Sequence, residues 1–305
     1  MRAAVVDRYG PPAVVRVAEV AAPTPRADEV VVRVSSAAVT VADSRIRGAR
    51  FPRGFAPVAR LVFGGSFSGV VEAVGSDVTG LAVGDEVSGT TGASMGAHAD
   101  LVAAKAKRVV KKPAGLTHDD AAAVLFGGTT ALFYLRDKAG VKPGQSVLVN
   151  GASGSIGTNA VQLAKHFGAT VTGVTSGGNA ALVSDLGADQ VIDYTRTPLD
   201  EVGERFDVVL DTVGNVSPAS GKRLLRPGGV LLLAVADLWQ TVTAHGQVKA
   251  GPAPERAEDA KLLLQLVADG TLKVVVDHAY DLVDIAAAHE RVDTGHKVGN
   301  VVVHP

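Results

Sequence analysis

The stretch Q-S-V-L-V-N-G-A-S-G-S-I-G, residues 145–157, decides the fold. Residues 146–149 form a short apolar run of the kind that makes a strand buried on both faces. An apolar-periodic segment follows and closes at Gly168, which predicts a strand, a turn and a helix. The turn between them holds three glycines: Gly151, Gly154 and Gly157. A helix that begins in a glycine turn presents free N–H groups and a positive dipole end, which suit a pyrophosphate.

Composition limits what the rest of the chain can be. The chain has 305 residues, of which 47% are apolar, so a packed protein of two domains is expected. A net charge of −1 gives no global attraction for nucleic acid or an anionic membrane. The sequence has no cysteine, which excludes disulfides, thiolate zinc sites, iron–sulfur clusters and a cysteine nucleophile.

Neither a secretory signal nor a membrane span is visible in the sequence. The first ten residues lack the apolar core of a signal peptide. The longest apolar run, residues 230–236, is far shorter than a membrane span. A soluble, cytoplasmic protein is therefore expected.

The first 115 residues hold short strand-like runs between turns rich in glycine, proline and aspartate, which predicts a barrel or sandwich. Strands are expected at residues 3–6, 14–20, 29–34, 70–74 and 86–88. Residues 45–57, which are basic and contain proline and glycine, are expected to form a loop.

Strands and helices alternate from Thr117 onward. A capping pattern at Thr117 predicts a helix that breaks at Gly127 and Gly128 and resumes over residues 130–139. The alternation predicts an α/β fold with a parallel, doubly wound sheet. Further strands are expected at residues 170–175, 190–192, 206–210 and 230–235, and after them at 273–276 and 298–303.

The glycine turn reads A-x-G-x-x-G in phase with its helix, so Ala152 stands where the dinucleotide fingerprint has its first glycine. The second strand ends V-T-S-G-G-N, without the Asp or Glu that binds the ribose 2′-hydroxyl in NAD sites. Ser176 and Asn179 are neutral hydrogen-bonding residues here, which favours NADPH over NADH. The alternative is that these residues form only a turn and that the site distinguishes poorly between NADPH and NADH. Tyr194 either adds a hydroxyl to the same phosphate or only covers the surface.

Several motifs occur in one order along nearly the whole chain. They include F-S-G-V-V-E-A-V-G-S-D-V-T-G at residues 67–80, G-G-T-T-A-L at 127–132, L-G-A-D-Q-V-I-D-Y at 186–194, D-V-V-L-D-T-V-G at 207–214 and G-H-K-V-G-N at 295–300. In these motifs the chain resembles the medium-chain dehydrogenase/reductase superfamily, in its zinc-free quinone oxidoreductase, or zeta-crystallin-like, branch. The resemblance implies a GroES-like catalytic domain of residues 1–117 and 271–305 and a Rossmann domain of residues 118–270.

The resemblance also implies cofactor contacts by position. Those near the nicotinamide are Thr129, Thr130, Val235 and Ala236; those of the pyrophosphate turn are Gly151, Ala152, Ser153, Gly154, Ser155, Ile156 and Gly157; those near the 2′-phosphate are Ser176, Asn179 and Tyr194; and those on the adenosine side are Val213, Gly214 and Asn215. Asn300 stands where relatives often carry a lysine.

The residues permit reduction without zinc. Zinc-dependent relatives hold their metal with cysteine and histidine, whereas this chain has no cysteine near Thr40 and reads G-G-S at residues 64–66. A quinone or an α,β-unsaturated ketone accepts hydride at carbon and needs only a hydrogen-bond donor or a solvent proton. Thr40 and Asp43 are the candidate catalytic residues. The alternatives are a packing role for Thr40 and a cap of the following turn for Asp43.

Other interpretations stay open at this point. An enoyl reductase that tailors a biosynthetic intermediate would use the same chemistry. A protein with vestigial catalysis that binds RNA would use the basic cluster at residues 105–112, although a solvated hairpin explains that cluster equally well. His98 is expected to make a structural hydrogen bond and His289 to pack within a helix interface. The resemblance further implies a homodimer.

Overall fold

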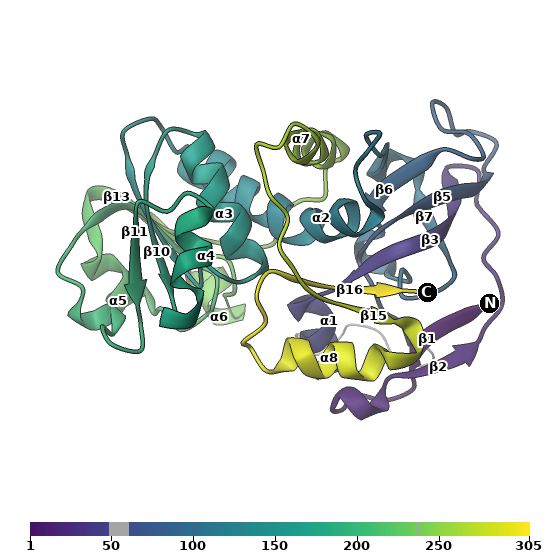
Figure 1. The fold of residues 1–305 in the computed structure, drawn as a ribbon, viewed down its shortest axis with the longest axis horizontal. Helices are drawn as coiled ribbons and strands as arrows, with labels where there is room; N and C mark the ends of the chain where they lie inside the picture. The colour runs from purple at the N-terminus through teal and green to yellow at the C-terminus, as the bar shows by residue number, and fades with distance from the viewer. Residues whose placement is uncertain (49–60, 237) are drawn as a thin grey trace. The chain divides into compact units, whose positions relative to one another are not determined.

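The computed structural model describes residues 1–48, 61–236 and 238–305, and its contacts divide the chain into two compact units (Figure 1). One unit comprises residues 1–126, 255–270 and 274–305, and the other comprises residues 127–254 and 271–273. The chain therefore returns to its first unit at residue 255 and leaves it again only for residues 271–273. The domain limits that the resemblance implies, at residues 117 and 270, remain a prediction.

A parallel sheet forms the second unit. Its strand order is β11-β10-β9-β12-β13-β14. In chain order the strands are β9 (Ser146–Asn150), β10 (Thr170–Thr175), β11 (Gln190–Asp193), β12 (Phe206–Asp211), β13 (Leu225–Leu233) and β14 (Val248–Ala250). The order reverses beside β9, which is the arrangement of a doubly wound dinucleotide-binding sheet. The predicted fold of this part is confirmed.

Helices cover both the centre and the edges of this sheet. The central strand β9 is buried along its whole length, as its apolar sequence predicts. Helices α3 (Ser155–His166) and α4 (Ala180–Asp185) pack on β9, β10 and β11. Helices α5 (Pro218–Arg223) and α6 (Leu238–Thr243) contact β13 and β14. The turns that follow the strands lie at the carboxyl edge of the sheet, where such folds bind their ligands.

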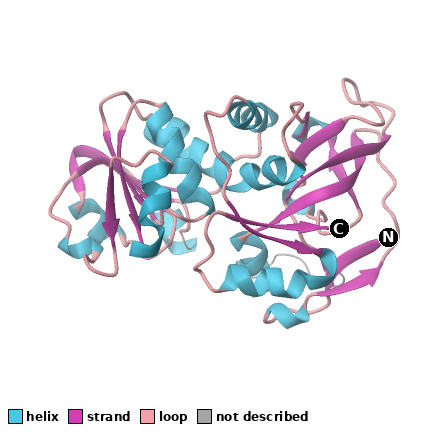
Figure 2. Cartoon of the chain, in the orientation of Figure 1, coloured by secondary structure: helices cyan, strands magenta, loops and turns pink. Residues whose placement is uncertain are grey.

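The first unit is built mostly from antiparallel strands, drawn in magenta in Figure 2. A three-stranded sheet contains β1 (Arg2–Val6), β2 (Arg16–Glu19) and β4 (Leu61–Val62). A seven-stranded sheet contains β15 (Val276–Asp281), β16 (Asn300–His304), β3 (Glu29–Val39), β5 (Ser66–Val74), β6 (Glu86–Thr90), β8 (Val109–Lys111) and β7 (Leu101–Lys105). Helix α8 (Ile285–Asp293) packs on β3, β15 and β16, and helix α7 (Ala257–Ala268) packs on β8. The seven-stranded sheet and α8 share a core cluster that is mostly buried valine and alanine.

The prediction of a loop at residues 45–57 is wrong for residues 45–47. Residues 45–47 are helical, because Thr40 and Asp43 form a capping box that starts helix α1 (Val41–Arg47). The rest of the expected loop, from residue 49 onward, lies outside the described residues.

The expected helix break at Gly127 and Gly128 is also wrong. Helix α2 (His118–Leu132) runs through both glycines and continues as a π-helical segment, η4 (Phe133–Ala139). A Cβ at Gly127 would lie 2.2 Å from the carbonyl oxygen of Ser155. This glycine therefore serves close packing against the start of α3 rather than a turn.

The strand expected at residues 273–276 begins only at Val276. The amide N–H of Lys273 donates to Oε1 of Gln162 at 2.7 Å, and Nε2 of Gln162 donates to the carbonyl of Lys273 at 3.0 Å. The backbone of Lys273 is thus bound by a side chain of α3 instead of a neighbouring strand. Among the described residues, no helix has both the length and the apolar character to cross a bilayer.

Candidate functional site

The glycine turn lies at the carboxyl end of the central strand β9. The N–H groups of Gly151 and Ala152 both donate to the carbonyl of Val174 in β10, at 3.1 and 2.9 Å. Gly151 has φ of +81°, in the region that favours glycine. A Cβ at Gly157 would lie 2.0 Å from the carbonyl oxygen of Gly151. Position 157 therefore admits no side chain while the turn keeps this path.

The start of helix α3 has the features of an anion site. Its N-cap, Gly154, is extended and makes no side-chain capping hydrogen bond, whereas Ser217 caps helix α5 with its hydroxyl. The first N–H groups of a helix have no partner within the helix itself. They point along the positive end of the helix dipole, which is the chemistry that holds a phosphate. The residues present thus fit a pyrophosphate at Ser155 and Ile156.

The methyl group of Ala152, which replaces the first glycine of the fingerprint, points into the core. Ala152 is fully buried, and a Cβ at Gly173 of β10 would lie 3.1 Å from its Cβ. The missing side chain at Gly173 leaves room for this methyl. The alanine is therefore accommodated by the neighbouring strand and does not fill the carboxyl edge.

Three of the predicted polar residues lie together where β9 and β10 end. The Oγ atom of Ser153 accepts hydrogen bonds from Oγ1 of Thr175 at 2.8 Å and from Nδ2 of Asn179 at 3.3 Å. The same Nδ2 donates to Oγ of Ser176 at 3.3 Å. Ser153, before α3, thus forms one neutral, hydrogen-bonding group with residues that lie 22 or more positions later, beyond α3.

A carboxylate that the sequence analysis did not single out, Asp193, completes this edge. Asp193 ends β11 and is the register partner of Thr175. Its Oδ1 accepts from the N–H and the hydroxyl of Thr195, at 3.0 and 2.7 Å. These hydrogen bonds lower the pKa of Asp193. The neighbouring Tyr194 is 45% exposed.

The carboxyl end of β12 is held by a second carboxylate, the buried Asp211. Its oxygens accept from the N–H groups of Val213, Gly214 and Val216 at 3.0 to 3.2 Å. Nδ2 of Asn150, at the end of β9, donates to Oδ1 of Asp211 at 2.9 Å and to Oδ1 of Asn215 at 2.7 Å. The predicted adenosine-side loop, residues 213–215, is thereby fixed to the central strand.

The end of β13 is fixed in a similar way. The hydroxyl of Tyr134, in η4, lies 3.0 Å from the carbonyl oxygen of Leu233 and 2.7 Å from that of Gly251, and burial raises the pKa of Tyr134 to about 12. Val235 follows this strand end, and its carbonyl oxygen would lie 3.1 Å from a Cβ at Gly214. The loops after β12 and β13 therefore touch.

Two of the predicted nicotinamide neighbours stand on helix α2. Thr129 is buried, and both it and Thr130 follow Gly127, where α2 approaches the first residue of α3. Ala236 is half-buried beyond the end of β13. The second unit therefore carries its predicted cofactor residues on α2 and after the ends of five adjacent strands, β11, β10, β9, β12 and β13.

Thr40, Asp43 and Asn300 belong to the first unit. The hydroxyl of Thr40 donates to Oδ2 of Asp43 at 2.7 Å, and Oδ1 of Asp43 accepts from the N–H of Gly64 at 3.1 Å. Asp43 is buried and caps helix α1, so its carboxylate holds the backbone at two places. Nδ2 of Asn300 donates to the carbonyl of Val275 at 3.0 Å.

The two histidines of the first unit lie in the core. The Nε2 atom of His98 is 3.0 Å from the carbonyl oxygen of Ala38, the kind of structural hydrogen bond expected for it. His289, on α8, is fully buried with its ring against Phe63 and His98. Burial, and next the nearby His98, lower the pKa of His289 to about 3. In the described part of the chain, no three His, Cys, Asp or Glu side chains are grouped as metal ligands.

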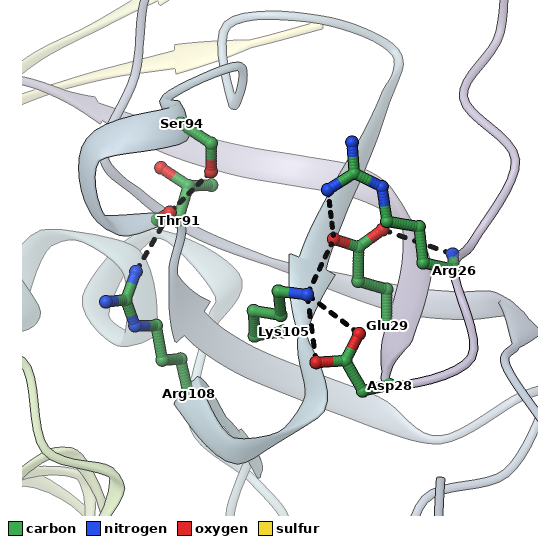
Figure 3. A network of polar contacts seen from close by, with 7 residues as sticks. All are labelled: Arg26, Asp28, Glu29, Thr91, Ser94, Lys105 and Arg108. Carbon is green, nitrogen blue, oxygen red and sulfur yellow. Dashed lines mark hydrogen bonds and ion pairs between the residues drawn. The ribbon is translucent and has the colours of Figure 1, made fainter. Parts of the chain in front are cut away.

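Several cations of the basic cluster at residues 105–112 are paired with carboxylates. Nζ of Lys105 lies 2.7 Å from Asp28 and 3.5 Å from Glu29. Figure 3 draws both ion pairs as dashed lines. Lys111 pairs with Asp85 at 2.9 Å and Lys112 with Glu86 at 3.2 Å. A nucleic acid phosphate would have to compete with these ion pairs, which counts against an RNA site. The expected hairpin is wrong, because β7 pairs with β3 and β8 pairs with β6 rather than with each other.

Comparison with known proteins places the chain in a family. Residues 26–114 match the alcohol dehydrogenase GroES-like domain, and residues 186–303 match the family described as zinc-binding dehydrogenase. The 2-methylene-furan-3-one reductase of Solanum lycopersicum is 32% identical over 302 residues, which cover 94% of this chain and 74% of that protein. A quinone oxidoreductase from Coxiella burnetii has the same fold, with a TM-score of 0.90 and 28% identity over 100% of this chain and 99% of that one. The chain belongs to the medium-chain dehydrogenase/reductase superfamily, in its quinone oxidoreductase-like branch.

Membership of this superfamily confirms the predicted GroES-like and Rossmann architecture. Another structure of the same fold is that of a mycobacterial protein complexed with NADPH, with a TM-score of 0.84 and 28% identity over the whole of both chains. The GroES-like match falls in the first unit, and the six-stranded parallel sheet forms the second.

Proposed function

We propose that this protein uses NADPH to reduce a quinone or an α,β-unsaturated carbonyl compound without zinc. The observation that carries the proposal is the group formed by Ser153, Ser176 and Asn179 beside the glycine turn. It places neutral hydrogen-bonding side chains where a Rossmann site meets the adenosine ribose. The mycobacterial relative complexed with NADPH supports the same cofactor.

Different residues of the second unit would hold different parts of the cofactor. The N–H groups at Ser155 and Ile156 would bind the pyrophosphate, because they open α3 without a side-chain cap. Ser176, Asn179 and Tyr194 would surround the 2′-phosphate. The remaining contacts would come from the loops at residues 213–215 and 235–236 and from Thr129 and Thr130. When bound, NADPH supplies the hydride.

Thr40 is the proposed hydrogen-bond donor to the acceptor oxygen. In this structure its hydroxyl proton is directed at Asp43. Donation to an acceptor would require this hydroxyl to rotate, while Asp43 stays bound by the N–H groups of Thr40 and Gly64. Asp43 would then act by holding Thr40 in place rather than by transferring a proton.

The acceptor class follows from the residues and the relatives together. Without cysteine, the chain lacks the thiolate ligands with which zinc-dependent relatives hold their metal. A conjugated acceptor takes hydride at carbon without a Lewis acid. The names of two relatives, a 2-methylene-furan-3-one reductase and a quinone oxidoreductase, support acceptors of this kind.

The test is NADPH oxidation, followed by absorbance at about 340 nm, against a panel of quinones and enones. We expect saturable oxidation with at least one member of the panel and none with saturated ketones of similar size. A saturated ketone reduced as fast as the matching enone would contradict the proposed acceptor class. No oxidation above the blank with any conjugated acceptor would contradict the proposed reaction.

A further inference from the structure

We propose that Asp193 sets the cofactor preference of this site, by weakening the binding of a 2′-phosphate and accepting a hydrogen bond from a free ribose 2′-hydroxyl. The inference rests on the proposed function, because it concerns the same nucleotide site. It adds a residue from β11 to a turn whose own residues, Ser176 and Asn179, are neutral. Its consequence is a protein that uses NADH as well as NADPH.

The position of Asp193 follows from the parallel pairing of two strands. β10 and β11 pair with Thr175 opposite Asp193, so both strands end at the same level. The chain leaving β10 turns at once through Ser176 and Gly177. A Cβ at Gly177 would lie 2.5 Å from Oδ2 of Asp193. The carboxylate therefore rests directly on the turn in which a 2′-phosphate would be held.

The carboxylate is fixed in this position rather than free in solvent. The N–H and hydroxyl of Thr195 bind its Oδ1, at 3.0 and 2.7 Å, while Oδ2 is the oxygen that lies against Gly177. The carboxyl is ionised near neutral pH, as aspartates ordinarily are, and the bonds from Thr195 lower its pKa further. A bound 2′-phosphate would thus meet a fixed negative charge.

The arrangement supplies from β11 what NAD-specific sites supply from the end of the second strand. In those sites an Asp or Glu binds the ribose 2′-hydroxyl and repels a 2′-phosphate. Here the second strand ends in serine and glycine, and the acid arrives from the third strand. Arg196, three residues after Asp193 in the same turn, attracts the carboxylate and offsets part of its charge. The expected effect is therefore a reduced preference for NADPH, not its reversal.

The test compares the dissociation constants of NADH and NADPH by calorimetry in the wild type and in Asp193→Asn. Asparagine keeps the shape and one oxygen acceptor but removes the charge. We expect the ratio Kd(NADH)/Kd(NADPH) to rise about fivefold to tenfold, mainly through tighter NADPH binding. The ratio Kd(AMP)/Kd(adenosine 2′,5′-bisphosphate) should rise by the same factor, and its measurement needs neither nicotinamide nor acceptor.

Two variants separate the charge at this position from other effects. Asp200→Asn removes an exposed charge in the next turn of the same unit and should leave the ratio unchanged. Thr195→Ala removes the hydroxyl that anchors Asp193 but keeps the charge, so the ratio should stay within about twofold of wild type. A general loss of folding weakens both nucleotides alike and cancels in the ratio.

An unchanged ratio in Asp193→Asn, or an equal rise in Asp200→Asn, would overturn the inference while leaving the proposed reaction intact. Absence of binding of either nucleotide to the wild-type protein would overturn both. Failure of the acceptor panel with normal nucleotide binding would count against the reaction alone.

Discussion

Gly157 faces the carbonyl oxygen of Gly151 so closely that a Cβ at position 157 would lie 2.0 Å from that oxygen. Real Cβ atoms do not approach carbonyl oxygens to this distance, so Gly157→Ala must move the turn or the start of α3. We expect a loss of about 2–4 kcal/mol of stability and at least a tenfold weaker NADPH affinity. Gly203→Ala is the matched control, because a Cβ there meets open space. Equal effects of the two variants in calorimetry and thermal unfolding would refute this role of Gly157.

Asp211 organises the loop after β12, so the acceptor oxygens of its carboxylate matter for stability. The carboxylate is buried and accepts three N–H groups besides Nδ2 of Asn150. Asp211→Asn would turn an NH₂ group toward donors, which leaves buried groups unpaired. We expect a loss of about 2–4 kcal/mol, measured by urea unfolding. A loss no greater than that of the exposed Asp200→Asn would count against this account.

Tyr134 ties η4 to the end of β13, beside the predicted nicotinamide neighbours. Its hydroxyl has one proton for two carbonyls, those of Leu233 and Gly251. Tyr134→Phe should cost about 1–2 kcal/mol, because buried carbonyls lose their donor. Tyr194→Phe, at an exposed hydroxyl, should leave thermal unfolding unchanged. The prediction fails if the two variants unfold at the same temperature.

Acid sensitivity should arise in part from His289. Burial lowers its pKa to about 3, while an unfolded chain has a histidine pKa of about 6.5. The unfolded state therefore binds this proton first, so the stability is complete above pH 6.5 and falls as the pH drops from 6.5 toward 3. By pH 5 the loss should be about 2 kcal/mol.

His289→Phe removes the titrating group and keeps an aromatic ring in the core. The difference in unfolding free energy between pH 7.5 and pH 5 should shrink by about 2 kcal/mol relative to wild type. His296→Gln, at an exposed histidine, should leave that difference as it was. An unaltered difference in His289→Phe would show that other groups carry the acid sensitivity.

The sequence was most informative where the structure depends on neighbouring residues. The strand, turn and helix around Gly151 and Gly157 lie within about twenty positions, and their pattern predicts them. The approach of Ser153 to Asn179 follows from the same strand–helix–strand unit. Residues 45–47 of helix α1, by contrast, were predicted to be a loop because glycine and proline follow them. Thr40 and Asp43 nevertheless have the sequence of its capping box.

The features that were missed depend on contacts between distant segments. Asp193 meets Gly177 only because β10 and β11 pair in one particular register, which a single sequence does not define. Helix α2 continues through Gly127 because close packing against Ser155 outweighs the low helix propensity of glycine. Lys273 leaves its expected strand because Gln162, far away in the sequence, binds its backbone.

The central claim is that hydride passes from the nicotinamide to a carbon of a conjugated acceptor. Its most direct test uses NADPH deuterated at the transferable C4 position and an enone that the protein reduces, with the product examined by mass spectrometry and NMR. The account predicts one deuterium at the β-carbon of each product molecule. A product that carries its deuterium at the carbonyl carbon, or that carries none, would contradict it.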